Sequence, residues 1–200
     1  MTQESVAHLE ETVHWFCEAF RPNVINVETL QPTAESDAAG LAPPDPYDFA
    51  LHCLGAMRAA REHGVALTYS AAETERPRET FCPLGRDAVI VSPDGTISGC
   101  YLLAEEWRRR GLDLDVGRID DGGRVFIDPV AVERLRSLVA DKPPRCAGCF
   151  CRSWCAGGCH VNPPTEAFCI QTRIITACTL LETLGAHDAA QCLAEERRDV

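Results

Sequence analysis

Apolar residues recur every three or four positions over residues 5–20, the spacing that places them along one face of an α-helix. The members of this apolar stripe are Val6, Leu9, Val13, Phe16, Cys17 and Phe20. The next segment, NVINVETL at residues 23–30, predicts a β-strand. The chain is therefore expected to begin with a surface helix that packs on an apolar partner, followed by a strand.

A second helix and strand are predicted after a connector rich in proline and glycine, residues 31–46. Residues 47–64 have helical periodicity and stop at Gly64, a natural C-cap, and VALTYS at residues 65–70 predicts the next strand. This order is typical of an α/β fold with a parallel sheet or barrel. Since two strands do not complete such a sheet, residues 1–78 are predicted to be the tail of a larger α/β sheet or barrel that something else completes.

The pattern changes from residue 79 onward. Residues 87–103 predict a β-hairpin whose turn contains Pro93, Asp94 and Gly95, and residues 112–119 predict a further short strand. Residues 128–140 predict a helix with Asp128 as N-cap, and residues 172–185 predict a last helix. We expect a small cysteine-rich domain over residues 79–185 and a charged tail over residues 186–200.

Composition narrows the function classes. The 200 residues are 46% hydrophobic and carry a formal net charge of -11, which argues against nucleic-acid binding. The only basic run, Arg108–Arg110, is interpreted as a solvated turn. No segment resembles a membrane span, a secretory signal or a transit peptide, so a cytoplasmic location is expected, with no membrane partner.

Cysteine is the residue type that points to chemistry. The chain has 12 cysteines, and in a reducing compartment so many thiols indicate metal binding or catalysis before disulfides. Short spacings such as C-x2-C let one turn direct two sulfurs at a metal, and Gly157 and Gly158 let the backbone curl close to a bulky centre. Spacing alone does not separate zinc from iron-sulfur. The ordered frame consists of Cys82, Cys100, Cys146, Cys149, Cys155, Cys159 and Cys169.

The frame reads C-x12-G-x4-C, then C-x2-C-x5-C-x3-C, then a last cysteine. This pattern resembles the seven-cysteine signature of the SPASM domain, the auxiliary-cluster module at the C-terminus of many radical SAM enzymes that modify peptides and proteins. The resemblance covers roughly residues 79–172. Residues 1–75 resemble, more weakly, the last helices and strands of the partial barrel that precedes this module.

The resemblance implies two 4Fe-4S clusters that serve electron transfer or substrate binding in radical-based modification of a peptide or protein. The first cluster would be held by Cys82, Cys100 and Cys159, and the second by Cys146, Cys149, Cys155 and Cys169. The first is one ligand short, so its fourth iron would be open or bound by Cys53 or Cys151. For Cys53, and for Cys17, Cys178 and Cys192, a role as a small core residue is the simpler interpretation.

One element of the family is missing. Radical SAM enzymes bind S-adenosylmethionine at a cluster held by a C-x3-C-x2-C loop, and this sequence contains no such loop. The chain is therefore not expected to cleave S-adenosylmethionine alone, and a protein partner carrying that half is predicted. A fragment of a larger enzyme, a free-standing cluster protein and a zinc-binding structural module without redox activity remain alternatives. Catalytic residues are unknown; Glu28 and Glu35 could face substrate, because barrel active sites form where strands end.

Overall fold

The computed structural model describes residues 1–186 and shows a mixed α/β protein, about 44% helix and 10% strand. It divides into two compact units. Of the described residues, unit 1 contains 1–78, 149–155 and 164–186, and unit 2 contains 79–148 and 156–163. All but the first residue of the predicted tail lies outside the described residues.

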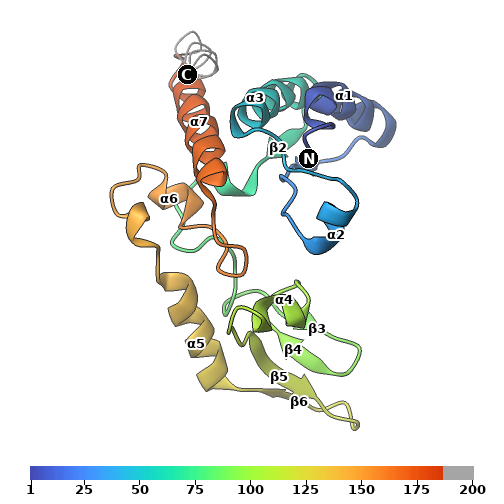
Figure 1. Ribbon diagram of the computed structural model, residues 1–200, viewed down its shortest axis with the longest axis vertical. Helices are drawn as coiled ribbons and strands as arrows, with labels where there is room; N and C mark the ends of the chain where they lie inside the picture. The colour runs from blue at the N-terminus through green and yellow to red at the C-terminus, as the bar shows by residue number, and fades with distance from the viewer. Residues whose placement is uncertain (187–200) are drawn as a thin grey trace. The chain divides into compact units, whose positions relative to one another are not determined.

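Unit 1 is built from helices around a small parallel sheet (Figure 1). Strands β1 and β2 pair in parallel, with Ile25 opposite Leu67, and helix α3 packs against both α1 and α7. The elements of unit 1 are η1 (Val6–His8), α1 (Leu9–Phe20), β1 (Val24–Asn26), α2 (Ala34–Ala38), α3 (Pro46–Glu62), β2 (Ala66–Thr68), η2 (Ser70–Ala72), α6 (Arg152–Cys155) and α7 (Glu166–Thr183).

The helices and strands predicted for residues 5–70 are present, with shorter strands. The carboxylate of Asp45 caps α3 by accepting from the backbone of Tyr47 at 2.8 Å, and Gly64 follows the helix at a φ of +71°. The connector contains α2, which was not predicted. A reciprocal capping box between Thr33 and Ser36 explains this short helix.

The apolar stripe of residues 6–20 is buried at some positions and exposed at others. Val6, Leu9, Val13 and Cys17 are buried, whereas Phe16 and Phe20 are 42% and 62% exposed. The expectation that the stripe packs on an apolar partner is therefore confirmed for the first four residues and wrong for the two phenylalanines. Trp15 joins these two phenylalanines in edge contacts, with ring centroids 5.0 and 5.3 Å apart.

Unit 2 is an antiparallel sheet in the order β3-β4-β5-β6, and helix α5 packs on β5 (Figure 1). Its core is formed by side chains that are at most 1% exposed, including Ile97, Trp107, Leu114 and Leu135. The elements of unit 2 are β3 (Ile90–Val91), β4 (Thr96–Ser98), α4 (Ala104–Arg108), β5 (Asp115–Ile119), β6 (Val125–Ile127), α5 (Pro129–Ala140) and η3 (Pro144–Cys146).

The hairpin turn of unit 2 requires glycine at position 95. Gly95 has a φ of +83°, and a Cβ there would lie 2.6 Å from the carbonyl oxygen of Ile119. Glycine is thus required at this position both by the backbone conformation and by the closeness of the neighbouring strand. The predicted hairpin is confirmed as β3 and β4, and the carboxylate of Asp128 caps α5 by accepting from Val130 at 2.8 Å.

Several details differ from the sequence expectations. Strand β6 and helix α4 were not predicted. The predicted solvated turn is confirmed for Arg109 and Arg110, whereas Arg108 ends α4 and its guanidinium lies 2.7 Å from the carboxylate of Asp115. The last helix begins at Glu166 rather than at residue 172, which places Cys169 inside α7. No helix within residues 1–186 has both the length and the apolar character needed to cross a membrane.

Candidate metal centre

The described cysteines fall into two classes of accessibility. All seven cysteines of the frame are partly exposed, whereas the four described cysteines outside it are buried. The buried thiols belong to Cys17, Cys53, Cys151 and Cys178. The predicted core role of Cys17, Cys53 and Cys178 is confirmed, and Cys192 lies outside the described residues.

Unit 2 brings together the three expected ligands of the first cluster. Cys82, Cys100 and Cys159 all pack against the apolar core of this unit. Burial raises the pKa of the Cys100 thiol, and negative charge on Cys159 and Cys82 acts in the same direction. Three thiols that repel one another when ionised are stabilised as thiolates by a cationic centre between them.

Backbone amides are directed at two of these sulfurs. The Asn162 N–H donates to Cys159 Sγ at 3.3 Å, and the Leu102 N–H donates to Cys100, which favours the ionised form of that thiol. Hydrogen bonds to the sulfurs are one of the means by which proteins set cluster potentials. The sequence analysis missed both contacts, because a backbone donor leaves no signal in residue type.

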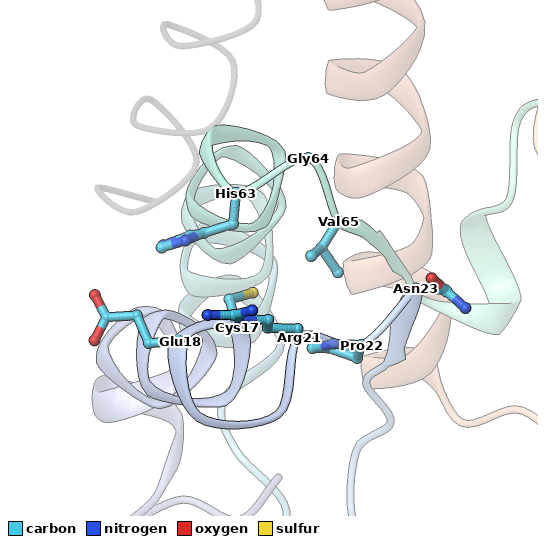
Figure 2. A pocket seen from close by; sticks show the side chains of 8 residues that line it. All are labelled: Cys17, Glu18, Arg21, Pro22, Asn23, His63, Gly64 and Val65. Carbon is cyan, nitrogen blue, oxygen red and sulfur yellow. The ribbon is translucent and has the colours of Figure 1, made fainter.

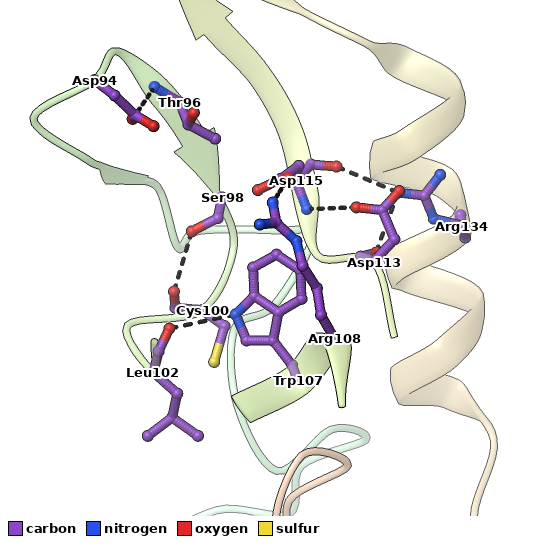
Figure 3. A network of polar contacts seen from close by, with 10 residues as sticks. All are labelled: Asp94, Thr96, Ser98, Cys100, Leu102, Trp107, Arg108, Asp113, Asp115 and Arg134. Atoms are coloured by element: carbon purple, nitrogen blue, oxygen red, sulfur yellow. Dashed lines mark hydrogen bonds and ion pairs between the residues drawn. The ribbon is translucent and has the colours of Figure 1, made fainter. Parts of the chain in front are cut away.

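The segment that carries Cys100 is fixed by a polar network (Figure 3). The Ser98 hydroxyl donates to the Cys100 carbonyl at 3.1 Å, and Trp107 Nε1 donates to the Leu102 carbonyl at 3.3 Å. Trp107 is only 1% exposed, so this indole anchors the loop to the core. The backbone on both sides of Cys100 is therefore held in place before any metal binds.

Unit 1 contains a second group of thiols, formed by Cys149, Cys155 and Cys169. The Arg173 guanidinium hydrogen-bonds Cys149 and interacts electrostatically with Cys169. Burial raises the pKa of the neighbouring Cys151 thiol, and negative charge on Cys149 and on Cys155 raises it further. Cys146, the fourth expected ligand of the second cluster, belongs to unit 2. Arg173 could not be linked to these thiols from the sequence, because the predicted helix began at residue 172 and did not include Cys169.

The two candidates for a further ligand have the character of core residues. Cys151 is 1% exposed, its Sγ lies 4.0 Å from the Thr172 carbonyl, and burial raises its pKa to about 12. Cys53 is fully buried, and burial raises its pKa to about 12 as well. Thiolates, rather than thiols, bind metals. Both residues lie in unit 1, whereas the three thiols of the first group lie in unit 2.

Polar groups meet where the strands of the parallel sheet end. Glu28 follows β1, and its carboxylate accepts from the backbone N–H of Ser70 at 3.1 Å and from the Ser70 hydroxyl. Burial raises the pKa of Glu28. Arg78 donates to the carbonyls of Ser70 and Trp154, which connects this edge to the loop that carries Cys149 and Cys155. Glu35, the other expected carboxylate, lies in the first turn of α2.

A cavity of about 540 Å³ lies at the other end of the same two strands (Figure 2). Its lining includes Arg21, Asn23 and His63, which come from the segments that lead into β1 and β2. His63 Nε2 lies 2.8 Å from Nδ1 of His14. Because this cavity is at the amino ends of the strands, it is separate from the edge where Glu28 and Ser70 meet.

The donor set can be compared with what each metal centre requires. Among residues 1–186, no three His, Cys, Asp or Glu side chains converge closely enough to hold a single metal ion. The thiolates of a zinc site all lie about 2.3 Å from one ion. The ligands of a 4Fe-4S cluster bind different irons and therefore stand further apart. The thiols suit both centres chemically.

Comparison of the chain with protein-family models, curated proteins and solved structures finds no match.

Proposed function

We propose that this chain is an iron-sulfur auxiliary-cluster protein of the radical SAM/SPASM type. The observation that carries the proposal is the accessibility of the thiols: the seven frame cysteines, and no other described cysteine, are partly exposed. Resemblance selects the same seven from spacing in the sequence. Two criteria thus agree on the seven thiols. Their division follows the resemblance: Cys82, Cys100 and Cys159 for the first cluster and Cys146, Cys149, Cys155 and Cys169 for the second.

The grouping of the thiols supports the interleaved assignment. Cys155 belongs to unit 1 and Cys159 to unit 2, although only three residues separate them. Those three residues, Ala156, Gly157 and Gly158, all have positive φ values, of 52°, 92° and 76°. A non-glycine residue in this region is uncommon, and a buried one indicates a backbone path that the surroundings impose. This tightly curled link directs neighbouring cysteines into different groups.

Bound clusters would supply one-electron transfer. The thiolates and the amides of Leu102 and Asn162 would hold and orient them, while Glu28 and Ser70 would form a polar wall for a peptide or protein substrate. Its position, where parallel strands end, is the edge at which α/β barrels build their sites. In unit 1, Arg78 links this wall to the loop bearing Cys149 and Cys155.

The proposal includes a protein partner that completes the parallel sheet and supplies the S-adenosylmethionine cluster. A two-stranded parallel sheet leaves backbone groups unpaired at its edges, and such a pair is marginal alone. The exposed rings of Trp15, Phe16 and Phe20 on α1 add an apolar surface to unit 1. Residues 1–78 would then be the last part of a partial barrel.

The test is the metal and sulfide content of the full-length chain, purified without oxygen and reconstituted with iron and sulfide. We expect about eight iron and eight sulfide per chain and a brown colour, as two 4Fe-4S clusters require. Stoichiometric zinc in a colourless protein that accepts no cluster would instead establish the alternative, a zinc-binding structural module.

A pair of variants on one helix sharpens this test. Cys169→Ser removes a partly exposed frame thiol of α7, whereas Cys178→Ser removes a buried thiol of the same helix. The first variant is expected to lose about four iron per chain and the second to retain all of them. Equal iron contents in the two variants would contradict the ligand assignment.

A further inference from the structure

Arg173 lies on the face of α7 that carries a frame cysteine. Glu166, Cys169 and Arg173 follow one another at spacings of three and four residues, so they share one side of the helix. The guanidinium lies 3.8 Å from the Glu166 carboxylate and hydrogen-bonds the thiol of Cys149, which comes from a different segment. One cation thus serves two expected ligands of the second cluster.

The first group of thiols receives hydrogen bonds from a different kind of donor. The hydrogen bonds to Cys100 and Cys159 come from the backbone amides of Leu102 and Asn162, which carry no net charge. A charged donor forms a stronger hydrogen bond to a thiolate than a neutral amide does. The two groups would therefore give their clusters different electrostatic surroundings.

We infer that Arg173 is a positioning residue that raises the reduction potential of the second cluster. This inference rests on the proposed function. Reduction adds one electron, and therefore one negative charge, to the cluster and its thiolates, and a fixed cation beside two of them stabilises the reduced form more than the oxidised form. The electron comes from a soluble low-potential donor, for which dithionite serves in the experiment. Because Arg173 is 42% exposed, solvent screens part of this effect.

The experiment is a potentiometric titration of the reconstituted full-length chain, followed by electron paramagnetic resonance. The signal of the second cluster is the one that Cys169→Ser alters. In Arg173→Gln we expect its reduction equilibrium constant to fall about tenfold, a shift of about 59 mV to lower potential for a one-electron couple. Arg173→Lys keeps the charge and should lie closer to the unmodified protein. Arg61→Gln, which loses the same charge beside Glu182, is the matched control and should leave the potential unchanged.

The outcomes separate this inference from the proposed function. If no cluster forms in the unmodified chain, the proposed function fails. If clusters form and the potentials in Arg173→Gln and Arg61→Gln are equal, the inference about Arg173 is wrong and the function stands. If Arg173→Gln loses the second cluster, the test passes to Arg173→Lys. A reduction potential of Arg173→Lys near that of the unmodified chain supports the role of the charge. A fall of about tenfold in the reduction equilibrium constant of Arg173→Lys overturns the inference.

Discussion

Cys151 is surrounded by the expected ligands of the second cluster, yet its own contacts point into helix α7. Its thiol interacts with Cys149 and lies 4.0 Å from the Thr172 carbonyl, so it docks the loop of residues 149–155 onto the helix. Residue type alone could not separate this docking thiol from its neighbours, because the difference lies in burial.

A serine at position 151 tests the docking role. Cys151→Ser buries a hydroxyl in place of the thiol but leaves the frame cysteines intact, so we expect full iron content and a loss of stability of about 1–3 kcal/mol. Cys149→Ser, two residues earlier, should lose about four iron per chain. Iron analysis beside urea unfolding measures both quantities, and loss of iron from Cys151→Ser would make Cys151 a ligand after all.

The buried thiol of Cys53 should make stability depend on alkaline pH. Burial raises its pKa from an ordinary value near 9 to about 12. The folded state keeps the proton that the unfolded chain releases. The stability that the buried thiol contributes is therefore complete below pH 9 and is lost as pH rises from about 9 toward 12. Linkage gives a loss of about 1.4 kcal/mol per pH unit in that window.

The measurement compares urea unfolding of the unmodified chain and of Cys53→Ala, both reduced and without oxygen. Below pH 9 the difference between them should be constant. Above pH 9, the stability of the variant should fall less steeply than that of the unmodified chain, and the two slopes should differ by about 1.4 kcal/mol per pH unit. Parallel curves up to pH 11 would show that Cys53 ionises freely in the folded protein.

At the scale of elements, the apolar stripe of helix α1 has both buried and exposed positions. Leu9→Ala should cost about 2–4 kcal/mol, because it empties a packed position that is 2% exposed. Phe20→Ala should cost under about 1 kcal/mol, since its ring is 62% exposed. Urea unfolding measures both losses. If Phe20→Ala were as costly as Leu9→Ala, the exposed half of the stripe would be part of the core of this chain.

Periodicity and caps predict the elements of this chain better than they predict its packing. Asp128 and the run after Gly64 mark a helix start and a strand correctly, because these signals are local. Strand β6 escaped prediction, since its three residues are all exposed and its pairing with β5 is decided by tertiary contacts. The exposure of Phe16 and Phe20 escaped it for the same reason: a stripe shows that a face is apolar and does not show what covers it.

At the scale of the whole molecule, the spacing of the cysteines predicted which thiols form the candidate site, and the fold added how they are grouped. Sequence order could not show that Cys155 and Cys159 belong to different compact units, because the division depends on contacts between distant segments. The donors directed at the sulfurs, such as Arg173 and the Asn162 amide, likewise became visible only in three dimensions.

The division into units leads to a prediction for the metal-loaded chain. Each cluster should stabilise the unit that holds most of its ligands, because metal binding contributes folding free energy, on the order of 10 kcal/mol in the zinc precedent. In Cys100→Ser, amide hydrogen exchange should quicken in unit 2, where this residue packs on the core, and stay unchanged in α3 of unit 1. Cys169→Ser should show the reverse, with faster exchange along α7 and unchanged exchange in β4 and β5. Equal loosening of both units in either variant would mean that the chain unfolds as one cooperative body and that neither cluster acts on one unit alone.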